Sequence, residues 1–471
     1  MDENKENKGT KSLTELYADF VVDLEYSKIP DEVLRKAKLL ILDNIGIMAA
    51  GESFSIVKPA VDKFYDMGGK EESSVIGRKG KIPAPNAAFC NSLILHSLDF
   101  DDTHLRSGIH MSATAVPTAL AIGELLQSTE QKLLEAIIAG YEIGARIGMA
   151  TVMWRHRGFH PTSVIGTFIA TTVASKLLGL SRDKLTSAYG ITASFSSGIL
   201  QNLIEGKWVK PFHPAWSSHG GIIAAELAKA GYEGPRNVLE GEHGLYNAFL
   251  YGDETPRRNF SQTLGSVWET LNISIKPYPS CHSTHSAIDA TRKLRPQIIK
   301  EVDCIESITV YAPQLSFDLG LFEVGKEKPN SPYDAKFSIP YTVAVALLKD
   351  NPSIWDFTDD SINEEKYLKI SKKVKGILDP EMEMYSAFDG RPARIVIKYN
   401  GKNIEEFVIN HKGTPGNPLT EENIVDKFKD NLTKTKYKEC TNRIINIVLG
   451  RNGITLSSLM GLLSNSKLCT N

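Results

Sequence analysis

The sequence predicts a mainly α protein, with a large all-helical domain and a smaller α/β domain inserted before the C-terminal helices. Three observations support this prediction. Apolar residues recur at helical spacing from Ser12 to about Trp268. After about Asn272, short β-branched segments of alternating polarity indicate strands. Helical spacing returns from Thr420.

The composition favours a globular protein and excludes some partners. At 471 residues the chain is too long for one ordinary core, and 42% hydrophobic with 23% charged residues is typical of folded proteins. Its 54 basic and 56 acidic residues leave a net charge of -2, which provides no field to hold nucleic acid or an anionic membrane. We therefore expect neither as a partner.

The N-terminus and the cysteines predict a cytoplasmic protein. Residues 1–11 are polar and charged, without the apolar core of a signal peptide or anchor, and are expected to form a disordered tail. Five cysteines, odd in number and without a CxxC pair, predict reduced thiols: Cys90, Cys281, Cys304, Cys440 and Cys469.

The helical domain is expected over residues 12–268. Ser12-Leu-Thr-Glu15 has the spacing of a capping box, and Pro30 and Gly51 bracket the next helix. Further helices are predicted over residues 87–98, 113–127, 130–152, 163–178, 182–200 and 217–230. Most are rich in Gly and Ala, which lets helices approach closely in a crowded core.

The α/β domain is expected over residues 269–410, and helices over 411–471 pack back on the first domain. ESITVYA, ARIVIKYN and IEEFVIN read as strands, and Asn400-Gly401 predicts a hairpin between the last two. EENIVDKFKDNL, YKECTNRIINIVLG and ITLSSLMGLL read as the C-terminal helices.

The densest reactive cluster is His96-Ser-Leu-Asp99-Phe-Asp101-Asp102-Thr103-His104, followed by His110. Three neighbouring carboxylates repel each other unless they bind a cation, accept amide hydrogens or tune an acid/base group. The alternative is that Asp101, Asp102 and Thr103 cap turns. The spacing matches no metal motif, so no metal is predicted.

Other motifs add histidines and lysines. His160 precedes Pro161 before an apolar helix, which suits a general acid or base, although a capping or core role is the alternative. Lys210 and Lys276 each precede a proline near aromatic residues, as expected of ammonium groups that receive carboxylates. His282-Ser-Thr-His285 has HxxH spacing, but two ligands make no zinc site.

Missing motifs narrow the chemistry. The sequence has no GxGxxG after a strand, no P-loop, no GxSxG and no CxxC. Nicotinamide, ATP, serine-hydrolase and iron–sulfur functions are therefore disfavoured.

NSLILHSLDFDDTH, GYEIGARIG, RGFHPTSVIGTF, KPFHPAWSSHGG, KPYPSCHSTH and AKFSIPYTVAVAL together resemble the MmgE/PrpD family, in order and spacing, from about Leu13 to beyond Asp350. This family includes 2-methylcitrate dehydratase, cis-aconitate decarboxylase and iminodisuccinate epimerase. The resemblance implies a large helical domain with a smaller α/β lid domain, a homodimer, and no metal or organic cofactor.

The resemblance to the decarboxylase branch also implies the site. Two lysines would bind substrate carboxylates, histidines would move protons and an aspartate would orient or tune them: Asp99, Thr103, His110, His160, Lys210 and Lys276. His282 and Tyr341 are added as candidates for substrate binding, although Tyr341 also fits an ordinary helix start. Phe100-Asp-Asp-Thr103 differs from the Tyr-Asn-Asp-Thr of many dehydratases, which weakens that assignment.

The predicted function is a cofactor-independent lyase, a dehydratase or decarboxylase. Its substrate is expected to be a small di- or tricarboxylate such as cis-aconitate or 2-methylcitrate, with proton transfer next to a carboxylate. The alternatives are an epimerase of an iminodisuccinate-like dicarboxylate and a non-catalytic carboxylate-binding protein.

Overall fold

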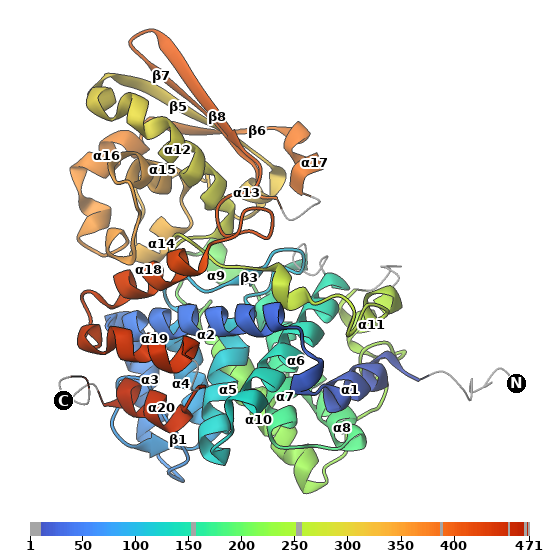
Figure 1. The fold of residues 1–471 in the computed structure, drawn as a ribbon. Helices are drawn as coiled ribbons and strands as arrows, with labels where there is room; N and C mark the ends of the chain where they lie inside the picture. Colours follow the sequence, from blue (N-terminus) through green and yellow to red (C-terminus); the bar gives the residue numbers. More distant parts are fainter. Residues whose placement is uncertain are drawn as a thin grey trace, which may run out of the picture.

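The computed structural model describes residues 11–151, 157–250, 257–386, 390–450, 453–465 and 469. The predicted tail, except for Lys11, lies outside these residues. The fold is mainly α, as predicted, with a helical part below and a part containing a four-stranded sheet above (Figure 1).

The helical part is organised around α7, where every residue from Pro161 to Ser175 is buried. Helix α7 packs against α5, α6, α8 and α10, and α10 also packs against α4. Gly221 allows one close approach, since a Cβ there would lie 2.5 Å from Ala170 Cβ. The helices of this part are α1 (Leu13–Asp23), α2 (Asp31–Gly51), α3 (Lys58–Asp66), α4 (Ala84–His96), α5 (Ser112–Leu126), α6 (Glu130–Met149), α7 (Pro161–Leu177), α8 (Arg182–Ala193), α9 (Gln201–Ile204), α10 (Phe212–Ala230) and α11 (Leu245–Phe249).

Two predicted helix boundaries were wrong. Helix α8 ends at Ala193, seven residues before the predicted end, and the φ of +130° at Gly198 does not allow a helix to continue to residue 200. Helix α10 begins at Phe212 and not at residue 217. Pro214 lies in its first turn, where a missing N–H costs no helical hydrogen bond. Position 152, the predicted end of α6, lies outside the described residues.

The upper part is built on a sheet of order β6-β5-β7-β8. Strand β5 (Ile305–Ala312) runs parallel to β6 (Val374–Leu378) and antiparallel to β7 (Ala393–Tyr399), which pairs with β8 (Lys402–Val408). The predicted hairpin turn is confirmed, with positive φ at both Asn400 and Gly401. Strand β6 was not predicted.

Helices cover this sheet from one side. Helix α12 (His285–Ile298) packs on β7 and β8, and α15 (Ile339–Leu348) packs on α12 (Figure 1). The remaining helices of this part are α13 (Gln314–Asp318), α14 (Pro332–Lys336), α16 (Glu365–Ser371) and α17 (Glu383–Ser386).

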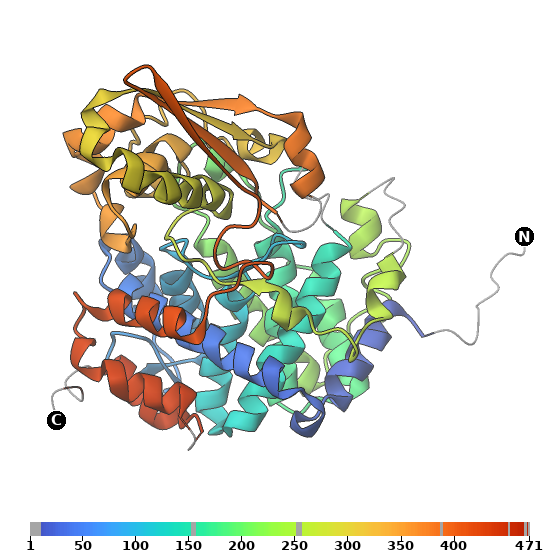
Figure 2. The same cartoon turned by 45° about the horizontal axis from the view of Figure 1, so that its top comes forward.

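The C-terminal helices lie against the helical part. Helices α18 (Glu421–Leu432) and α19 (Thr441–Leu449) pack on α2, and α20 (Leu456–Ser464) packs on α5. Figures 1 and 2 both show α18 and α19, in red, beside the blue α2. The predicted domain boundaries, and closure of the upper part as a lid, stay predictions.

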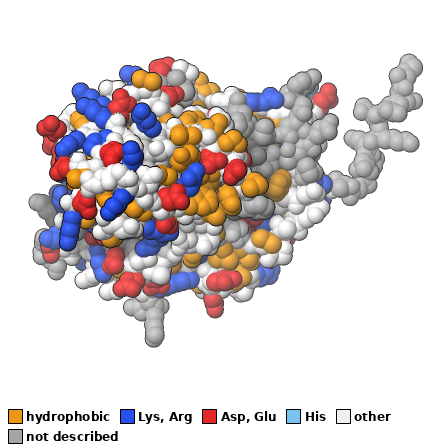
Figure 3. Space-filling view, turned by 90° about the horizontal axis from the view of Figure 1, so that it is seen from above, with side chains coloured by type: hydrophobic (Ala, Val, Ile, Leu, Met, Phe, Trp, Pro, Cys, Tyr) orange, Lys and Arg blue, Asp and Glu red, His pale blue; other side chains and the backbone are white. Residues whose placement is uncertain are grey.

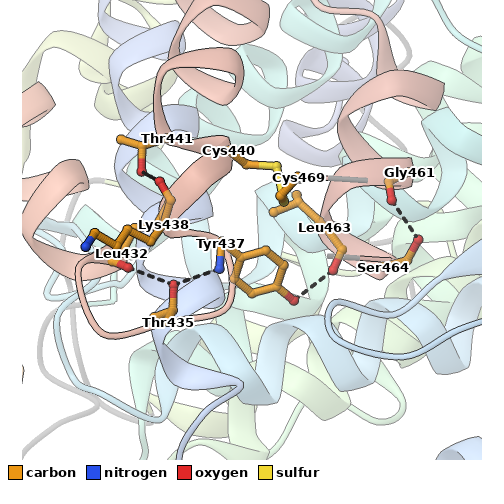
Figure 4. Close-up of a disulfide and its surroundings, with 10 residues drawn as sticks. All are labelled: Leu432, Thr435, Tyr437, Lys438, Cys440, Thr441, Gly461, Leu463, Ser464 and Cys469. Atoms are coloured by element: carbon orange, nitrogen blue, oxygen red, sulfur yellow. Dashed lines mark hydrogen bonds between the residues drawn. A yellow bond between two sulfur atoms is a disulfide. The ribbon is translucent and has the colours of Figure 1, made fainter. Parts of the chain in front are cut away.

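The expectation of unpaired cysteines was wrong for one pair. Cys440, at the start of α19, forms a disulfide with Cys469, with the Cα atoms 4.9 Å apart (Figure 4). The sequence separation of 29 hides this contact, because α20 returns toward α19 only in the folded chain. Cys90, Cys281 and Cys304 are free.

The surface of the upper part mixes charge and apolar area. Seen from above, Lys and Arg side chains alternate with Asp and Glu around an apolar area (Figure 3). The exposed large apolar residues of this part include Ile377, Leu378, Met384 and Phe407. The mixture agrees with the near-zero net charge.

The described helices were also compared with the requirements of a membrane span. No single one among them has the length and apolar character to cross a bilayer. Helix α2 and residues Ser55–Asp66, which meet at an 85° bend, are together long and apolar enough for a span, by length and composition only.

Candidate active site

A pocket of about 100 Å³ is lined by both parts of the protein. Phe337 and Arg391 of the upper part line it, together with Asp99 and Thr103 from the segment that follows α4. Seven of the eight side chains predicted for the site line this pocket: Asp99, Thr103, His110, His160, Lys210, Lys276 and His282.

A short two-stranded pairing brings distant motifs together. Strand β3 (Thr103–His104) pairs with β4 (Ile273–Ser274), so Thr103 lies opposite Ser274. This places Lys276, two residues after β4, beside the loop that carries Asp99. Asp99 has φ of 49°, a left-handed conformation that costs energy for a residue other than glycine and is common at functional sites.

Asp99 binds both lysines of the pocket. Its carboxylate accepts hydrogen bonds from Lys210 Nζ and, at 3.1 Å, from Lys276 Nζ, which also donates to the Asp99 carbonyl at 2.7 Å. All three side chains are buried. Burial alone would raise the pKa of Asp99, but the two ammonium charges outweigh it and hold this pKa well below its usual range. The carboxylate therefore stays charged.

His110 lies between Asp101 and Lys210. Its Nδ1 is 3.1 Å from an Asp101 oxygen, and its Nε2 is 3.5 Å from Lys210 Nζ. Burial lowers the pKa of His110 to about 3, against the opposing effect of Asp101. The neutral ring donates from Nδ1 to Asp101 and presents the lone pair of Nε2. Asp101 also accepts from His96 Nδ1 at 2.9 Å.

His160 begins α7 and pairs with a second histidine. The Nδ1 atoms of His160 and His213 are 2.8 Å apart, so one ring donates to the other. Burial, followed by the charge of His213, holds the pKa of His160 well below its usual value. The backbone N–H of His160 donates to Gly198 at 3.0 Å, which fixes the ring beside the pocket.

Thr103 connects two of the pocket histidines. Its hydroxyl is 3.0 Å from His282 Nδ1 and 3.4 Å from His110 Nδ1. Both rings are buried. The hydroxyl can therefore orient either ring.

Asp102 fits the alternative interpretation of the acidic cluster. It accepts from the backbone N–H of Ser112 at the start of α5, at 3.2 Å, and from Asn44 Nδ2 at 2.8 Å. Burial raises the pKa of Asp102 to about 6. This carboxylate caps a helix, while Asp99 contacts the two pocket lysines and Asp101 contacts His110.

The structure does not bring Tyr341 into the pocket. Its hydroxyl donates to the Asp356 carbonyl at 3.0 Å, and its ring packs against Phe357 and Tyr367 inside the upper part. Lys336 of the same segment is also buried, and its Nζ donates to the Pro279 carbonyl at 3.1 Å. The alternative of an ordinary helix start describes Tyr341 better.

Several residues in or behind the pocket were not predicted. Asp101, His96 and His213 do not line the pocket but contact His110, Asp101 and His160, and although they stand inside motifs that the sequence singled out, spacing does not say which way each side chain points. Cys281 and Arg391 line the pocket itself. Arg391 carries no sequence signal, because it becomes a pocket residue when its guanidinium reaches across the two parts to the Leu105 carbonyl at 3.1 Å.

The pocket favours acid/base chemistry over a metal. His96, Asp99 and His110 place one possible ligand atom each within 4.8 Å of the others. However, both lysine ammonium groups already occupy Asp99, and Lys210 faces His110. These fixed charges repel a cation and attract a carboxylate.

Comparisons with known proteins show the family of the chain. Residues 15–258 match the model of the MmgE/PrpD N-terminal domain, and residues 278–450 match that of the MmgE/PrpD C-terminal domain. Human cis-aconitate decarboxylase is 27% identical over 98% of both chains, and that of Aspergillus terreus is 27% identical over 94% of both. The 2-methylcitrate dehydratase of Escherichia coli is 23% identical over 80% of this chain and 81% of its own. The chain belongs to the MmgE/PrpD family.

Proposed function

We propose that this protein is a lyase that decarboxylates a small tricarboxylate of the cis-aconitate type. The contact of Asp99 with two buried lysines, beside neutral histidines, is the observation that carries the proposal. The relatives support it, since those named decarboxylases match at higher identity and over more of the chain than those named dehydratases.

The cations of the pocket supply the binding of substrate carboxylates. Lys210 and Lys276 line it, and their two charges exceed the single charge of Asp99. A carboxylate placed among them gains charge-assisted hydrogen bonds in a site largely shielded from water. A polycarboxylate fits better than a monocarboxylate, because the two lysines offer one ammonium partner to each of two carboxylate groups.

Substrate binding also prepares the proton donor. The pKa of His110 is low in the empty pocket because of burial and the two lysine charges. Negative substrate charge opposes both lysines and raises this pKa, and Asp101 at 3.1 Å stabilises the resulting imidazolium. His110 then holds a proton next to the substrate only when the substrate is present.

The reaction balances with side chains alone. The bond between a substrate carbon and its carboxylate breaks, CO₂ leaves, and the electron pair enters the conjugated system that ends at a second carboxylate. Lys210 and Lys276 stabilise that charge, and an imidazole, His110 or His160, delivers one proton to carbon. No redox step occurs, so independence of a cofactor is part of the proposal.

A proton NMR time course in D₂O tests this function. The purified chain is given cis-aconitate, 2-methylcitrate, citrate and iminodisuccinate in separate reactions. We expect a decarboxylated product with carbon-bound deuterium from cis-aconitate. We also expect loss of turnover in Lys276→Ala and normal turnover in Lys300→Ala, a matched change at an exposed lysine.

Each other result has a meaning. Turnover of 2-methylcitrate alone would replace the decarboxylase with a dehydratase, and deuterium exchange with retained mass would indicate an epimerase. Substrate binding with no turnover by the folded protein would contradict an enzyme. The homodimer stays a prediction, which light scattering of the purified chain measures.

A further inference from the structure

The pocket has an apolar side that the proposed chemistry does not use. Four leucines line the pocket together with its lysines and histidines. Each of them is half-buried, so part of its side chain stays open to solvent. Two come from the helical part and two from the upper part, and we call this set the leucine wall: Leu200, Leu203, Leu315 and Leu319.

The lower half of the leucine wall lies beside His160. The N–H of Leu203 donates to the Leu200 carbonyl at 2.9 Å, so these two side chains lie about one turn apart on one face of the chain. The N–H of Leu200 donates to the Gly158 carbonyl at 2.8 Å, and the N–H of His160 donates to the Gly198 carbonyl at 3.0 Å. These two bonds hold Leu200 next to the segment that carries His160.

The upper half of the leucine wall belongs to α13 and the residue after it. The N–H of Leu319 donates to the Leu315 carbonyl at 3.1 Å, so both side chains lie on the same face, one helical turn apart. Helix α13 packs against residues His282–Thr284, and His282 lines the pocket. This contact places the upper leucines at the pocket.

Phe337 joins the leucine wall to the charged side of the pocket. Its ring is buried and lines the pocket, and Lys210 Nζ lies 5.5 Å from the ring centroid. The apolar side of the pocket therefore begins directly beside an ammonium group.

A tricarboxylate without a substituent has no part that matches the leucine wall. Most of its atoms belong to carboxylates, and placing their charge against apolar surface costs free energy. The lysines can receive these carboxylates, but the leucines cannot. Half-exposed leucines gain free energy when an apolar group covers them. The leucine wall therefore fits an apolar substituent of the substrate.

We propose that the leucine wall is a subsite for an alkyl chain, and that the substrate is a cis-aconitate-type tricarboxylate with such a chain on its carbon skeleton. This inference rests on the proposed function, since Lys210 and Lys276 hold the carboxylates while the chain lies against the leucines. The chain takes no part in the bond that breaks, so the decarboxylation step is unchanged.

The alkyl chain needs little space inside the pocket of about 100 Å³. Because the leucines are half-buried, the chain can cover the sides of them that face solvent. One chain in this position contacts leucines of both parts of the protein, so both parts contribute to holding the same substrate.

Binding of two unreactive analogues tests the subsite. The first is tricarballylate, the saturated counterpart of cis-aconitate, and the second is tricarballylate with a linear butyl group on a terminal carbon. Neither has the conjugated system that receives the electron pair, so calorimetry measures binding without turnover. We expect the butyl analogue to bind at least about tenfold more tightly, because each fully buried methylene contributes about fourfold. Its heat-capacity change on binding should also be more negative.

Variants in the two halves of the leucine wall locate the chain. Leu203→Gln and Leu319→Gln each introduce a polar amide that an alkyl chain covers only at a cost, so the affinity ratio of the two analogues should fall by at least about threefold. Leu126→Gln, at an exposed leucine of α5, is the matched control and should keep the wild-type ratio. The Tm of each variant shows that it is folded.

The outcomes separate the subsite from the proposed function. Tricarballylate binding with a gain of less than about tenfold from the butyl group overturns the subsite and leaves the decarboxylase standing. A wild-type ratio in both folded wall variants also overturns it, because the chain would then lie elsewhere. Binding of neither analogue would overturn the proposed function together with the subsite.

Discussion

The carboxylate of Asp99 holds the two lysines that would receive the substrate. In the structure both ammonium groups reach one buried carboxylate, so neither is a free surface charge. This arrangement holds both ammonium groups beside the pocket. A substitution that removes the negative charge of Asp99 but keeps the volume of its side chain should therefore disturb both lysines.

Asp99→Asn is the residue-scale prediction. The amide keeps the volume but leaves two buried ammonium groups without their anion, so we expect a loss of about 3–5 kcal/mol in the free energy of unfolding. We also expect kcat/KM to fall by about 10²–10⁴-fold, since the lysines lose their position. Urea unfolding and cis-aconitate turnover measure the two effects.

Asp303→Asn is the matched control, because Asp303 pairs with Lys369 at 2.7 Å on the exposed surface. This variant should change neither quantity measurably. If Asp99→Asn behaves like Asp303→Asn, the buried contact is not what organises the pocket.

At this scale the sequence predicted which motifs meet but not the role of each side chain. Asp99 was expected to orient or tune a histidine, and that role stays a prediction. In the structure Asp101 contacts His110, and Asp99 contacts the two lysines. The left-handed backbone conformation at Asp99 points the side chains of Asp99 and Asp101 in different directions, so each carboxylate has different partners. No spacing rule reports such a turn.

Helix α18 connects the C-terminal segment to the acidic loop. Lys427 Nζ pairs with Asp43 of α2 at 2.7 Å and donates to the Phe100 carbonyl at 3.1 Å. Both side chains are buried. One side chain thus joins two helices to the residue that follows Asp99.

Lys427→Met is therefore expected to destabilise the protein and disturb the site. It leaves Asp43 buried and unpaired, which should cost about 3–5 kcal/mol. The hydrogen bond from Lys427 to the Phe100 carbonyl is also lost. The loop that carries Asp99 is then held less firmly, so kcat should also fall. Lys429→Met, at an exposed lysine on the same helix, is the control for thermal unfolding and turnover. Equal Tm values for the two variants would contradict the prediction.

The disulfide gives a second prediction at the element scale. It ties the start of α19 to the end of the chain beyond α20, where Tyr437 also donates to the Leu463 carbonyl at 2.8 Å (Figure 4). Closing the 29-residue separation should contribute about 3.6 kcal/mol by the chain-entropy model. Cys469→Ser should therefore lower Tm, while Cys304→Ser, at a free and exposed cysteine, should not.

Thiol titration checks the bond itself. The unfolded chain should show three free thiols before reduction and five after it. Five thiols before reduction, in protein protected from reductants, would show that Cys440 and Cys469 do not pair.

Helices and strands were predicted best where the local signal was strong. The hairpin of β7 and β8 follows from Asn400-Gly401, and the start of α1 from its capping box. Strand β6 has no such signal, because VKGIL becomes a strand by pairing with β5 across more than sixty residues of chain. Tertiary pairing decided that element.

At the scale of the whole molecule, burial of histidines links stability to pH. Four rings around the pocket, His96, His110, His160 and His213, are buried, and burial lowers the pKa of each. The pKa falls to about 3 for His110 and to about 4 for His213. In the unfolded chain each ring would titrate near about 6.5.

The sign of the effect follows from proton binding. As pH falls through about 6.5 the unfolded chain takes up protons that the folded protein does not, so the unfolded state is favoured. The stability is complete above about 6.5 and is lost as pH falls toward the folded values. Asp99 and Asp101, whose pKa values are held well below normal against the effect of burial, lose their contribution at still lower pH.

We therefore expect the free energy of unfolding to fall by about 1.4 kcal/mol per pH unit for each histidine that stays neutral, starting near about pH 6.5. Urea unfolding between about pH 7.5 and about pH 5 measures the slope. His213→Asn should reduce the slope by one histidine, because the variant has no ring to protonate in the unfolded chain. His243→Asn removes an exposed ring and should leave the slope unchanged. A free energy of unfolding that stays constant over this range would mean that the pocket histidines are protonated in the folded protein. His110 would then carry its proton before the substrate binds, which would contradict the proposal that substrate binding raises its pKa.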